Sequence, residues 1–148
     1  MRKPRLMVRE TGAKPVVVDA SIAVKWFAPE ADSELADRLI AEDRILVAPD
    51  IMPVEAANAW WKKVRRGEME KSDLEQAVAG LVAMGLEWIP VLSLVERAAT
   101  MAVDTGHTVY DCTYLVACAE RGASIATADE RMRGTADRMR LKVWRPAN

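Results

Sequence analysis

Four acidic residues occupy positions where a surface charge is not expected: Asp19, Glu55, Asp111 and Asp129. Asp19 ends the apolar run Val16–Val18, and Asp129 follows residues 124–128 in the same way. Both side chains are therefore expected at the carboxyl edge of a buried strand, where open parallel sheets bind ligands. A helix N-cap is the alternative for each, although Ser21 is the better cap candidate after Asp19.

Asp111 and Glu55 are singled out by their places on helices. Asp111 is the first member of an apolar stripe that continues at i+3, i+4 and i+7, so its side chain is expected to point inward. A capping role stays open, because Asp111 lies near the helix start. Glu55 lies one turn into its helix, and Asn58 at i+3 is a candidate support. Its small neighbours leave room for a ligand.

Convergence of these acids would be costly without a counter-charge. Two carboxylates about 5 Å apart repel by roughly 3 kcal/mol at an effective dielectric near 20. Protonation or a bound cation would relieve the repulsion. A cluster of oxygen donors without histidine suits Mg²⁺ or Mn²⁺. The four acids are therefore predicted to be metal ligands.

Several other functions are disfavoured by what the chain contains. The one histidine, His107, excludes a zinc site built from histidines and leaves a Ser-His-Asp hydrolase without a nucleophile elbow. The glycines stand singly, so no phosphate-binding loop or nucleotide cofactor is expected. Cys112 and Cys118 lie about 9 Å apart along one helix, too far to bridge, and are predicted to be free thiols. No membrane span or signal peptide is expected, which makes the cytoplasm the default compartment.

The elements that must position the acids alternate along the chain. Short apolar strands are expected at 16–19, 45–48, 86–91 and 124–128, and Lys142-Val143-Trp144 follow the last helix. Helical spacing is expected at 21–28, 32–41, 51–66, 71–84, 93–104, 110–121 and 130–140. Ser93 is the expected cap of the helix at 93–104. This order predicts an α/β fold with a covered parallel sheet of four to five strands. Residues 1–14 read as a flexible basic leader, and 15–148 as a single domain.

The acids lie in motifs that resemble those of PIN-domain nucleases, specifically VapC-like toxins. The matching segments are Val18-Asp19-Ala20-Ser21, Pro53 to Ala59, Tyr110 to Ala117 and Ala126-Thr127-Ala128-Asp129, and the resemblance spans residues 16–144. It implies a three-layer α/β/α sandwich and an endoribonuclease that uses Mg²⁺ or Mn²⁺. It further implies a VapB-like antitoxin, a homodimer and a toxin-antitoxin operon. The basic leader departs from the family pattern, since such toxins usually begin almost at the first strand.

On this reading, cations held by the four acids activate a water and neutralise charge on the phosphate of single-stranded RNA. The hydroxyls of Ser21 and Thr127 are expected to orient a water or a carboxylate, with an N-cap as the alternative for Ser21. The net charge of -1 requires any RNA contact to be a local patch. Candidates, each equally readable as a solvated face, are Lys62, Lys63, Arg65, Arg66, Arg131 and Arg133.

Two further points stay open in the sequence. Trp60 and Trp61 are adjacent on a helix, so both can hardly be core, and one is a candidate interface anchor. The main rival function is a catalytically silent PIN-like module that binds RNA or a partner. A phosphatase of the haloacid dehalogenase type would want a second Asp two residues after Asp19, where this chain has Ser21.

Overall fold

A computed structural model describes residues 14–28 and 30–148. Over these residues a five-stranded parallel sheet is formed by β1 (Val16–Val18), β2 (Leu46–Pro49), β3 (Glu87–Ile89), β4 (Ser124–Ala126) and β5 (Lys142–Val143). The helices are α1 (Ala20–Phe27), α2 (Ser33–Ala41), α3 (Met52–Arg65), α4 (Lys71–Ala83), the 3-10 turn η1 (Val91–Ser93), α5 (Val95–Thr105), α6 (Val109–Arg121) and α7 (Glu130–Arg138). The predicted α/β class is confirmed.

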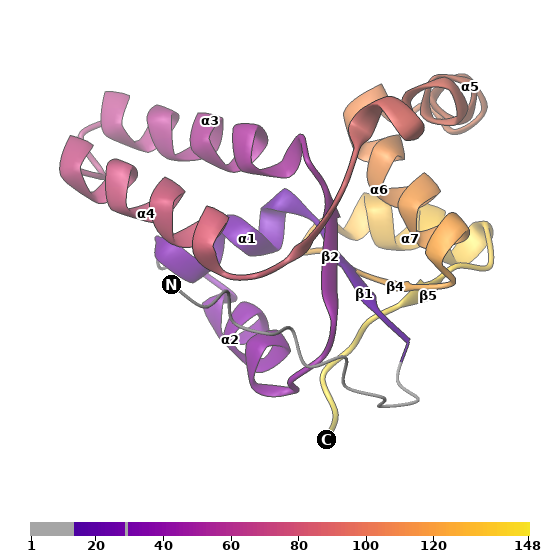
Figure 1. Ribbon diagram of the computed structural model, residues 1–148, viewed down its shortest axis with the longest axis horizontal. Coiled ribbons are helices and arrows are strands. Elements are labelled where there is room, and N and C mark those ends of the chain that lie inside the picture. Colours follow the sequence, from indigo (N-terminus) through magenta and orange to yellow (C-terminus); the bar gives the residue numbers. More distant parts are fainter. Residues whose placement is uncertain (1–13, 29) are drawn as a thin grey trace, which may run out of the picture.

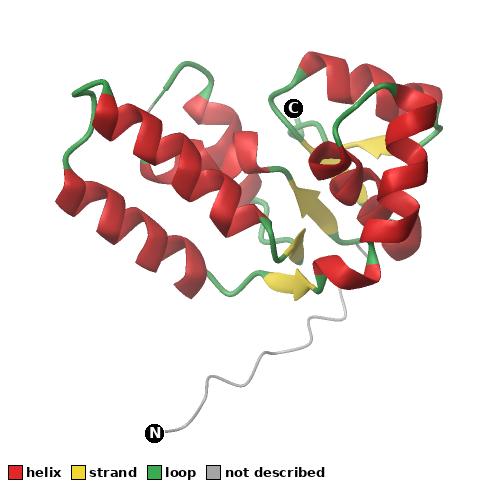
Figure 2. Cartoon of the chain, turned by 90° about the horizontal axis from the view of Figure 1, so that it is seen from above, coloured by secondary structure: helices red, strands yellow, loops and turns green. Residues whose placement is uncertain are grey.

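The order of the strands places a ligand-binding edge at β1 and β4. The sheet runs β3-β2-β1-β4-β5, with every pair parallel. The chain moves outward from β1 on one side and from β4 on the other, so α1–α4 cover one face and α5–α7 the opposite face (Figures 1 and 2). Crossovers on opposite faces leave a crevice beyond the carboxyl ends of the two central strands. Asp19 and Thr127 follow those two strands directly.

The centre of the sheet is apolar on both faces, as its run of valines predicts. Val16–Val18 are fully buried, which explains why the strand lacks an alternating polar face. The adjacent tryptophans divide as expected from their angular separation on α3. Trp60 is fully buried and donates its indole N–H to the carbonyl of Val24 at 3.2 Å. Trp61 is 47% exposed, and the guanidinium of Arg65 lies 5.1 Å from its ring.

The predicted end of the third strand and the predicted start of the next helix are both wrong. The strand ends at Ile89, because Pro90 has no N–H for the sheet, and η1 follows in place of a continued strand. Ser93 donates its hydroxyl to the carbonyl of Pro90 at 2.6 Å and caps no helix, so α5 begins at Val95. The predicted basic leader, apart from Lys14, lies outside the described residues.

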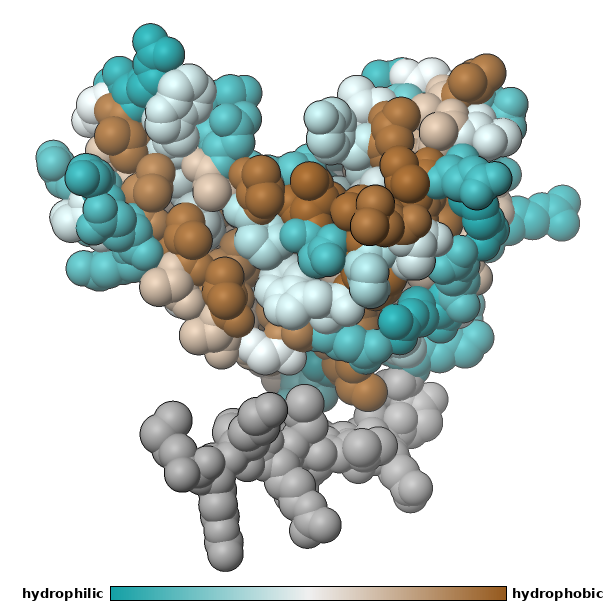
Figure 3. All heavy atoms as spheres, turned by 45° about the horizontal axis from the view of Figure 1, so that its top comes forward, coloured by the Kyte–Doolittle hydropathy of each residue, from teal (hydrophilic) through white to brown (hydrophobic). Residues whose placement is uncertain are grey.

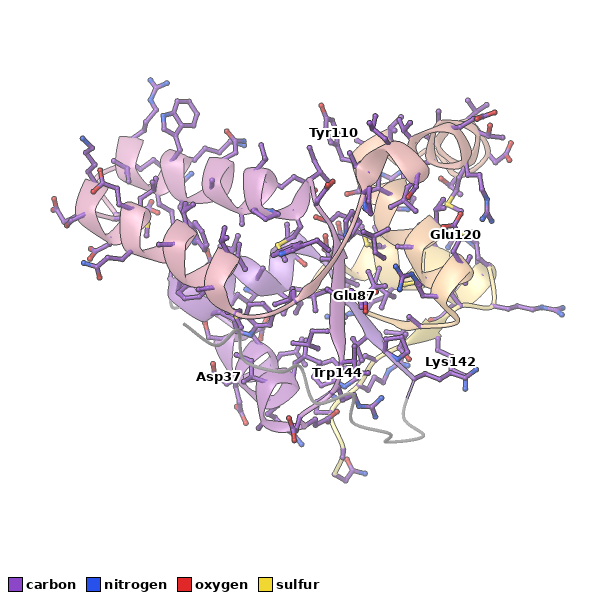
Figure 4. The ribbon with its side chains drawn as sticks, viewed as in Figure 1. Asp37, Glu87, Tyr110, Glu120, Lys142 and Trp144 are labelled. Carbon is purple, nitrogen blue, oxygen red and sulfur yellow. The ribbon has the colours of Figure 1, made fainter. Side chains whose placement is uncertain are left out.

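The last strand is held to α2 by polar contacts near the carboxyl end of the chain. Trp144, labelled in Figure 4, donates its indole N–H to Glu42 at 2.8 Å. Elsewhere, Cys112 and Cys118 are buried free thiols, as predicted. Burial raises the pKa of the Cys118 thiol to about 12, so it stays protonated and unreactive near neutral pH. None of the described helices has the length and hydropathy needed to cross a membrane.

Candidate active site

Asp19 lies at the carboxyl end of β1, with its side chain fixed by two hydroxyls. The Ser21 hydroxyl donates to Asp19 Oδ2 at 2.6 Å, and the Thr127 hydroxyl donates to the same oxygen at 2.8 Å. The parallel register that pairs Val18 with Ala126 brings Thr127 beside Asp19 across 108 residues of sequence. Ser21 therefore serves the carboxylate and does not cap α1, so the alternative of an N-cap is wrong for Ser21.

The electrostatic environment of Asp19 is that of a buried charge beside another charge. Asp19 is only 6% exposed, and this burial raises the pKa of its carboxyl above the ordinary value. The negative charge of Asp111 raises that pKa further, while the hydrogen bonds from Ser21 and Thr127 act in the opposite direction. A buried carboxylate held in one orientation is poised to bind a cation.

Glu55 is brought to the same end of the sheet by the first turn of α3. Its Oε1 accepts a hydrogen bond from the hydroxyl of Tyr114 on α6 at 2.7 Å. Burial raises the pKa of Glu55, and the charges of Asp19 and Asp111 raise it further. Burial and the nearby charges also raise the pKa of the Tyr114 phenol, which keeps it protonated as a donor. Three of the four predicted acids are thus electrostatically coupled.

Asp111 enters the site from the first turn of α6, and its side chain is 31% exposed. It does not cap the helix: the cap is Thr108, whose hydroxyl accepts the Asp111 N–H at 3.2 Å. The carboxylate instead lies beside His107, with Asp111 Oδ2 3.5 Å from His107 Nδ1. The side chain therefore stands at the buried edge of the site while keeping access to solvent.

Asp129 is engaged as the cap of α7. Its Oδ1 accepts the backbone N–H groups of Arg131 at 2.9 Å and Met132 at 3.2 Å, so the alternative reading as an N-cap is correct for this acid. Its backbone N–H donates to the Thr127 hydroxyl at 3.1 Å, which places Asp129 next to the Asp19 cluster. One oxygen is committed to the helix, and the role of this residue as a ligand stays a prediction.

Replacing Asp129 separates its structural role from any other. Asp129→Ala is expected to lower the free energy of unfolding by about 1 kcal/mol, because the first N–H groups of α7 lose their acceptor. Asp129→Asn should stay close to wild type, since Asn is as good a cap as Asp. Urea unfolding of the three proteins measures both differences. An equal loss in the two variants would show that the carboxylate charge, and not capping, stabilises the helix.

The donor set fits a hydrated divalent cation better than a closed metal site. No group of three or more His, Cys, Asp or Glu side chains among residues 14–28 and 30–148 is arranged to hold a metal ion. Mg²⁺ commonly keeps several waters and binds proteins through one or two carboxylates together with substrate phosphate. Asp19, Glu55 and Asp111 offer such oxygen donors and carry mutual repulsion that a cation would relieve.

A groove of about 670 Å³ extends from Glu55 along α3. Its other polar lining includes Asn58, Lys62, Lys63 and Arg66, and Tyr110 closes it from the side of α6. Figure 3 shows the surface hollowed between the side of α3 and the side of α6, and Figure 4 shows Tyr110 at the start of α6. The groove is thus lined both by basic residues that were predicted to contact RNA and by Glu55.

The basic residues that were predicted to contact RNA differ in how far their side chains are engaged by other groups of the protein. Lys63 pairs with Glu30 at 2.6 Å and Arg66 pairs with Glu68 at 2.9 Å, whereas Lys62 has no ion pair within the described residues. On α7, the side chain of Arg131 donates to the Gly106 carbonyl at 3.0 Å, and that of Arg133 donates to the Thr127 carbonyl at 3.1 Å. Asn58 lines the groove, whereas the hydrogen-bond partner of Glu55 is Tyr114.

The motifs and the fold agree with a known family. A family model of the PIN domain matches residues 16–138. The chain belongs to the PIN-domain family. The resemblance drawn from the four motifs is therefore confirmed, and the acids of this PIN domain stand in the segments that carried it.

Known proteins that are similar to this PIN domain include a ribonuclease in sequence and toxins in fold. The chain is 29% identical over 119 residues to Ribonuclease VapC3 of Pyrobaculum aerophilum, covering 79% of this chain and 91% of the relative. It superposes with a TM-score of 0.69 on Mycobacterium tuberculosis VapC20, a toxin that cleaves the sarcin-ricin loop, at 19% identity over 88% of this chain and 99% of that one. A toxin-antitoxin complex from Klebsiella pneumoniae gives a TM-score of 0.58 at 12% identity, covering 90% and 98%.

Two site contacts are missing from the sequence-based prediction. Tyr114 reads as a core residue because it lies on the apolar stripe of α6, yet its hydroxyl holds Glu55. His107 reads as a turn residue, yet its ring is buried against Asp111. One feature of the sequence could have identified the role of Tyr114: a tyrosine assigned to the core carries a hydroxyl, and a buried hydroxyl usually needs a hydrogen-bond partner.

Proposed function

We propose that the chain is a Mg²⁺- or Mn²⁺-dependent endoribonuclease that hydrolyses phosphodiester bonds of single-stranded RNA. We further propose that it acts in the cytoplasm as the toxin of a VapBC-type pair. The observation that carries the proposal is a buried carboxylate, Asp19, held by two hydroxyls at the carboxyl end of β1. Glu55 and Asp111 lie near enough for their charges to interact with that of Asp19. Ribonuclease VapC3, the relative at 29% identity, supports the reaction class.

Each group at the site has a distinct task in this proposal. Asp19, Glu55 and Asp111 would hold the cation, with Asp129 as an outer member. The bound cation would supply activation of a water and charge neutralisation on the phosphate. Ser21 and Thr127 fix Asp19 through the two hydrogen bonds to Oδ2. Tyr114 fixes Glu55 in the same manner, so the carboxylates are oriented before substrate arrives.

The RNA path follows the groove along α3. Lys62, Lys63 and Arg66 line this groove and would neutralise backbone phosphates on the way to Glu55. Tyr110 is 59% exposed on the opposite wall, where its ring can stack on an unpaired base. A groove of mixed charge suits a single strand bound locally and agrees with a chain whose net charge is -1.

A VapB-like antitoxin and a homodimer complete the proposal. Four exposed apolar side chains lie on elements around the hollow in Figure 3: Val54, Leu92, Val95 and Val109, which are 63%, 85%, 43% and 38% exposed. Exposed apolar surface of this kind commonly marks a protein interface. The Klebsiella pneumoniae structure, a toxin-antitoxin complex of the same fold, supports an antitoxin as one of the partners.

Cleavage of single-stranded RNA by the purified chain tests the proposed activity. With Mg²⁺ present, we expect the wild-type chain to cut the RNA and Asp111→Asn to be slower by at least about 100-fold, since ligands matter more than their supports. The partly exposed Asp111 caps no helix, so the variant should keep the circular dichroism spectrum of wild type and should be no less stable. Equal cleavage by the two proteins would show that the site is elsewhere or that the activity is a contaminant.

Expression in a bacterial host tests the toxin role separately. Wild-type chain should arrest growth, whereas Asp111→Asn should not. Mapping of the RNA ends produced after induction would identify the substrate. Harmless overexpression of a soluble wild-type chain would favour the catalytically silent module.

A further inference from the structure

His107 is buried between Asp111 and α7. It follows Gly106, which ends α5, and its side chain is 1% exposed. The Nδ1 atom lies 3.5 Å from Asp111 Oδ2, and the Nε2 atom lies 2.5 Å from the Thr135 hydroxyl. A buried imidazole with a protein partner for each nitrogen is held in one orientation. His107 is also the only histidine of the chain.

Thr135 is itself fixed by neighbours on α7. Its hydroxyl accepts a hydrogen bond from Arg138 Nη2 at 2.9 Å and lies 3.1 Å from the carbonyl of Arg131. The residue is 2% exposed, so water does not compete for these contacts. A chain of polar contacts therefore runs from Arg138 through Thr135 and His107 to the carboxylate of Asp111.

The protons available along this series of polar contacts decide which ring nitrogen of His107 donates to Asp111. Arg138 can only donate, so the single proton of the Thr135 hydroxyl goes either to His107 Nε2 or to the Arg131 carbonyl. If it goes to Nε2, a neutral ring carries its proton on Nδ1 and donates to Asp111. If it goes to the carbonyl, Nε2 keeps the ring proton and the bare Nδ1 lone pair faces a carboxylate oxygen. The first arrangement replaces repulsion by a hydrogen bond.

We infer that His107 is a positioning residue that holds the Asp111 carboxylate in the site by donating from Nδ1. The inference rests on the proposed function for its kinetic consequence. The Asp111 side chain is 31% exposed, whereas Asp19 is 6% exposed, so the Asp111 carboxylate has more freedom to rotate away toward solvent. A histidine anchored to α7 through Thr135 limits that rotation. Residues that orient a metal-binding carboxylate typically change activity about 10- to 100-fold when they are replaced.

Two conservative variants separate positioning from packing. The amide N–H of Asn reaches about the place of Nδ1, so His107→Asn keeps a donor for Asp111. The amide of Gln reaches about the place of Nε2, so His107→Gln keeps only the contact with Thr135. We expect His107→Gln to lower kcat by about 10- to 100-fold with a smaller change in KM, and His107→Asn to recover most of that loss. Equal losses in the two variants, following their losses in Tm, would overturn the inference.

The lone imidazole also gives a readout that does not depend on cleavage. Nitrogen-15 NMR of the metal-free chain at neutral pH reports which ring nitrogen carries a proton. We expect a protonated Nδ1 in wild type and a changed Nδ1 signal in Asp111→Asn. An unprotonated Nδ1, or a signal unaffected by Asp111→Asn, would overturn the inference. If neither wild type nor any variant cleaves RNA, the proposed function fails while the NMR result still decides the contact.

Discussion

Asp19→Asn is expected to reduce RNA cleavage by at least about 100-fold and at the same time to raise the thermal stability of the metal-free protein. Cleavage falls because the variant loses a charged ligand at the centre of the site. Stability rises because Asp19 is 6% exposed and its charge is opposed by burial and by Asp111. The Asn carboxamide oxygen can still accept from Ser21 and Thr127, so the hydroxyls keep a partner.

The expected gain is roughly 1 kcal/mol, which is a shift of a few degrees in Tm for a chain of this size. Calorimetry in chelator measures the gain, and a cleavage assay with Mg²⁺ measures the loss. Asp37→Asn is a matched control, because Asp37 is an exposed acid on α2, labelled in Figure 4. It should leave both quantities unchanged. A less stable Asp19→Asn would mean that the carboxylate stabilises the fold and is not held there at a cost.

Opposite changes in stability and activity are a general sign of a functional site, because selection keeps charges there that the fold alone would reject. The position of Asp19 in the sequence is enough to predict a charge that the fold alone would reject. The run of valines before it predicts a strand buried on both faces, and a carboxylate at the end of such a strand has no solvated face of its own. The sequence therefore predicts Asp19 and the sheet edge together.

The contacts that orient the acids could not be predicted in the same way. Thr127 meets Asp19 because β1 and β4 pair in one register, and the register depends on packing of the whole sheet. Tyr114 meets Glu55 across 59 residues, and helical periodicity places a tyrosine on the buried face without saying what its hydroxyl contacts. Local patterns locate elements, whereas pairing between distant side chains depends on their tertiary arrangement.

For Asp129, the sequence could not distinguish between two roles. A cap and a metal ligand require the same residue at the same place, an acid just before a helix, so the sequence left the two readings open. The two hydrogen bonds from the α7 backbone show that the cap is real. Capping does not exclude a second task, because a carboxylate has two oxygens and only Oδ1 is used by the helix.

Removal of divalent cations is expected to stop RNA cleavage, and addition of Mg²⁺ or Mn²⁺ to restore it. The three coupled carboxylates cannot hold a phosphate by themselves, since like charges repel. Cleavage in the presence of excess chelator would remove the metal from the mechanism. The Lys62→Ala variant is a useful companion, because it should weaken RNA binding while leaving the dependence on metal unchanged.

The same cation should change how stability depends on pH. Asp19 and Glu55 have folded pKa values above the unfolded values of 3.8 and 4.5, so the folded chain binds protons more tightly. The free energy of unfolding of the metal-free chain should therefore fall as pH rises from those values through the folded pKa values. Glu30 has the opposite effect on the pH dependence of stability. Burial alone would raise the pKa of its carboxyl, but Lys63 and Lys25 outweigh burial and lower that pKa. The stability that ionised Glu30 contributes is therefore lost as the pH falls through its folded pKa.

Metal-free protein should consequently be most stable at mildly acidic pH, and Mg²⁺ should restore stability near neutral pH. A cation that binds only the folded state adds about 2.7 kcal/mol at 100 times its Kd. Urea unfolding at several pH values, with chelator or with Mg²⁺, measures both effects. Asp19→Asn should show a weaker pH dependence and a smaller gain from Mg²⁺. An identical gain in the variant would place the cation away from Asp19, because the site would then bind it without that carboxylate.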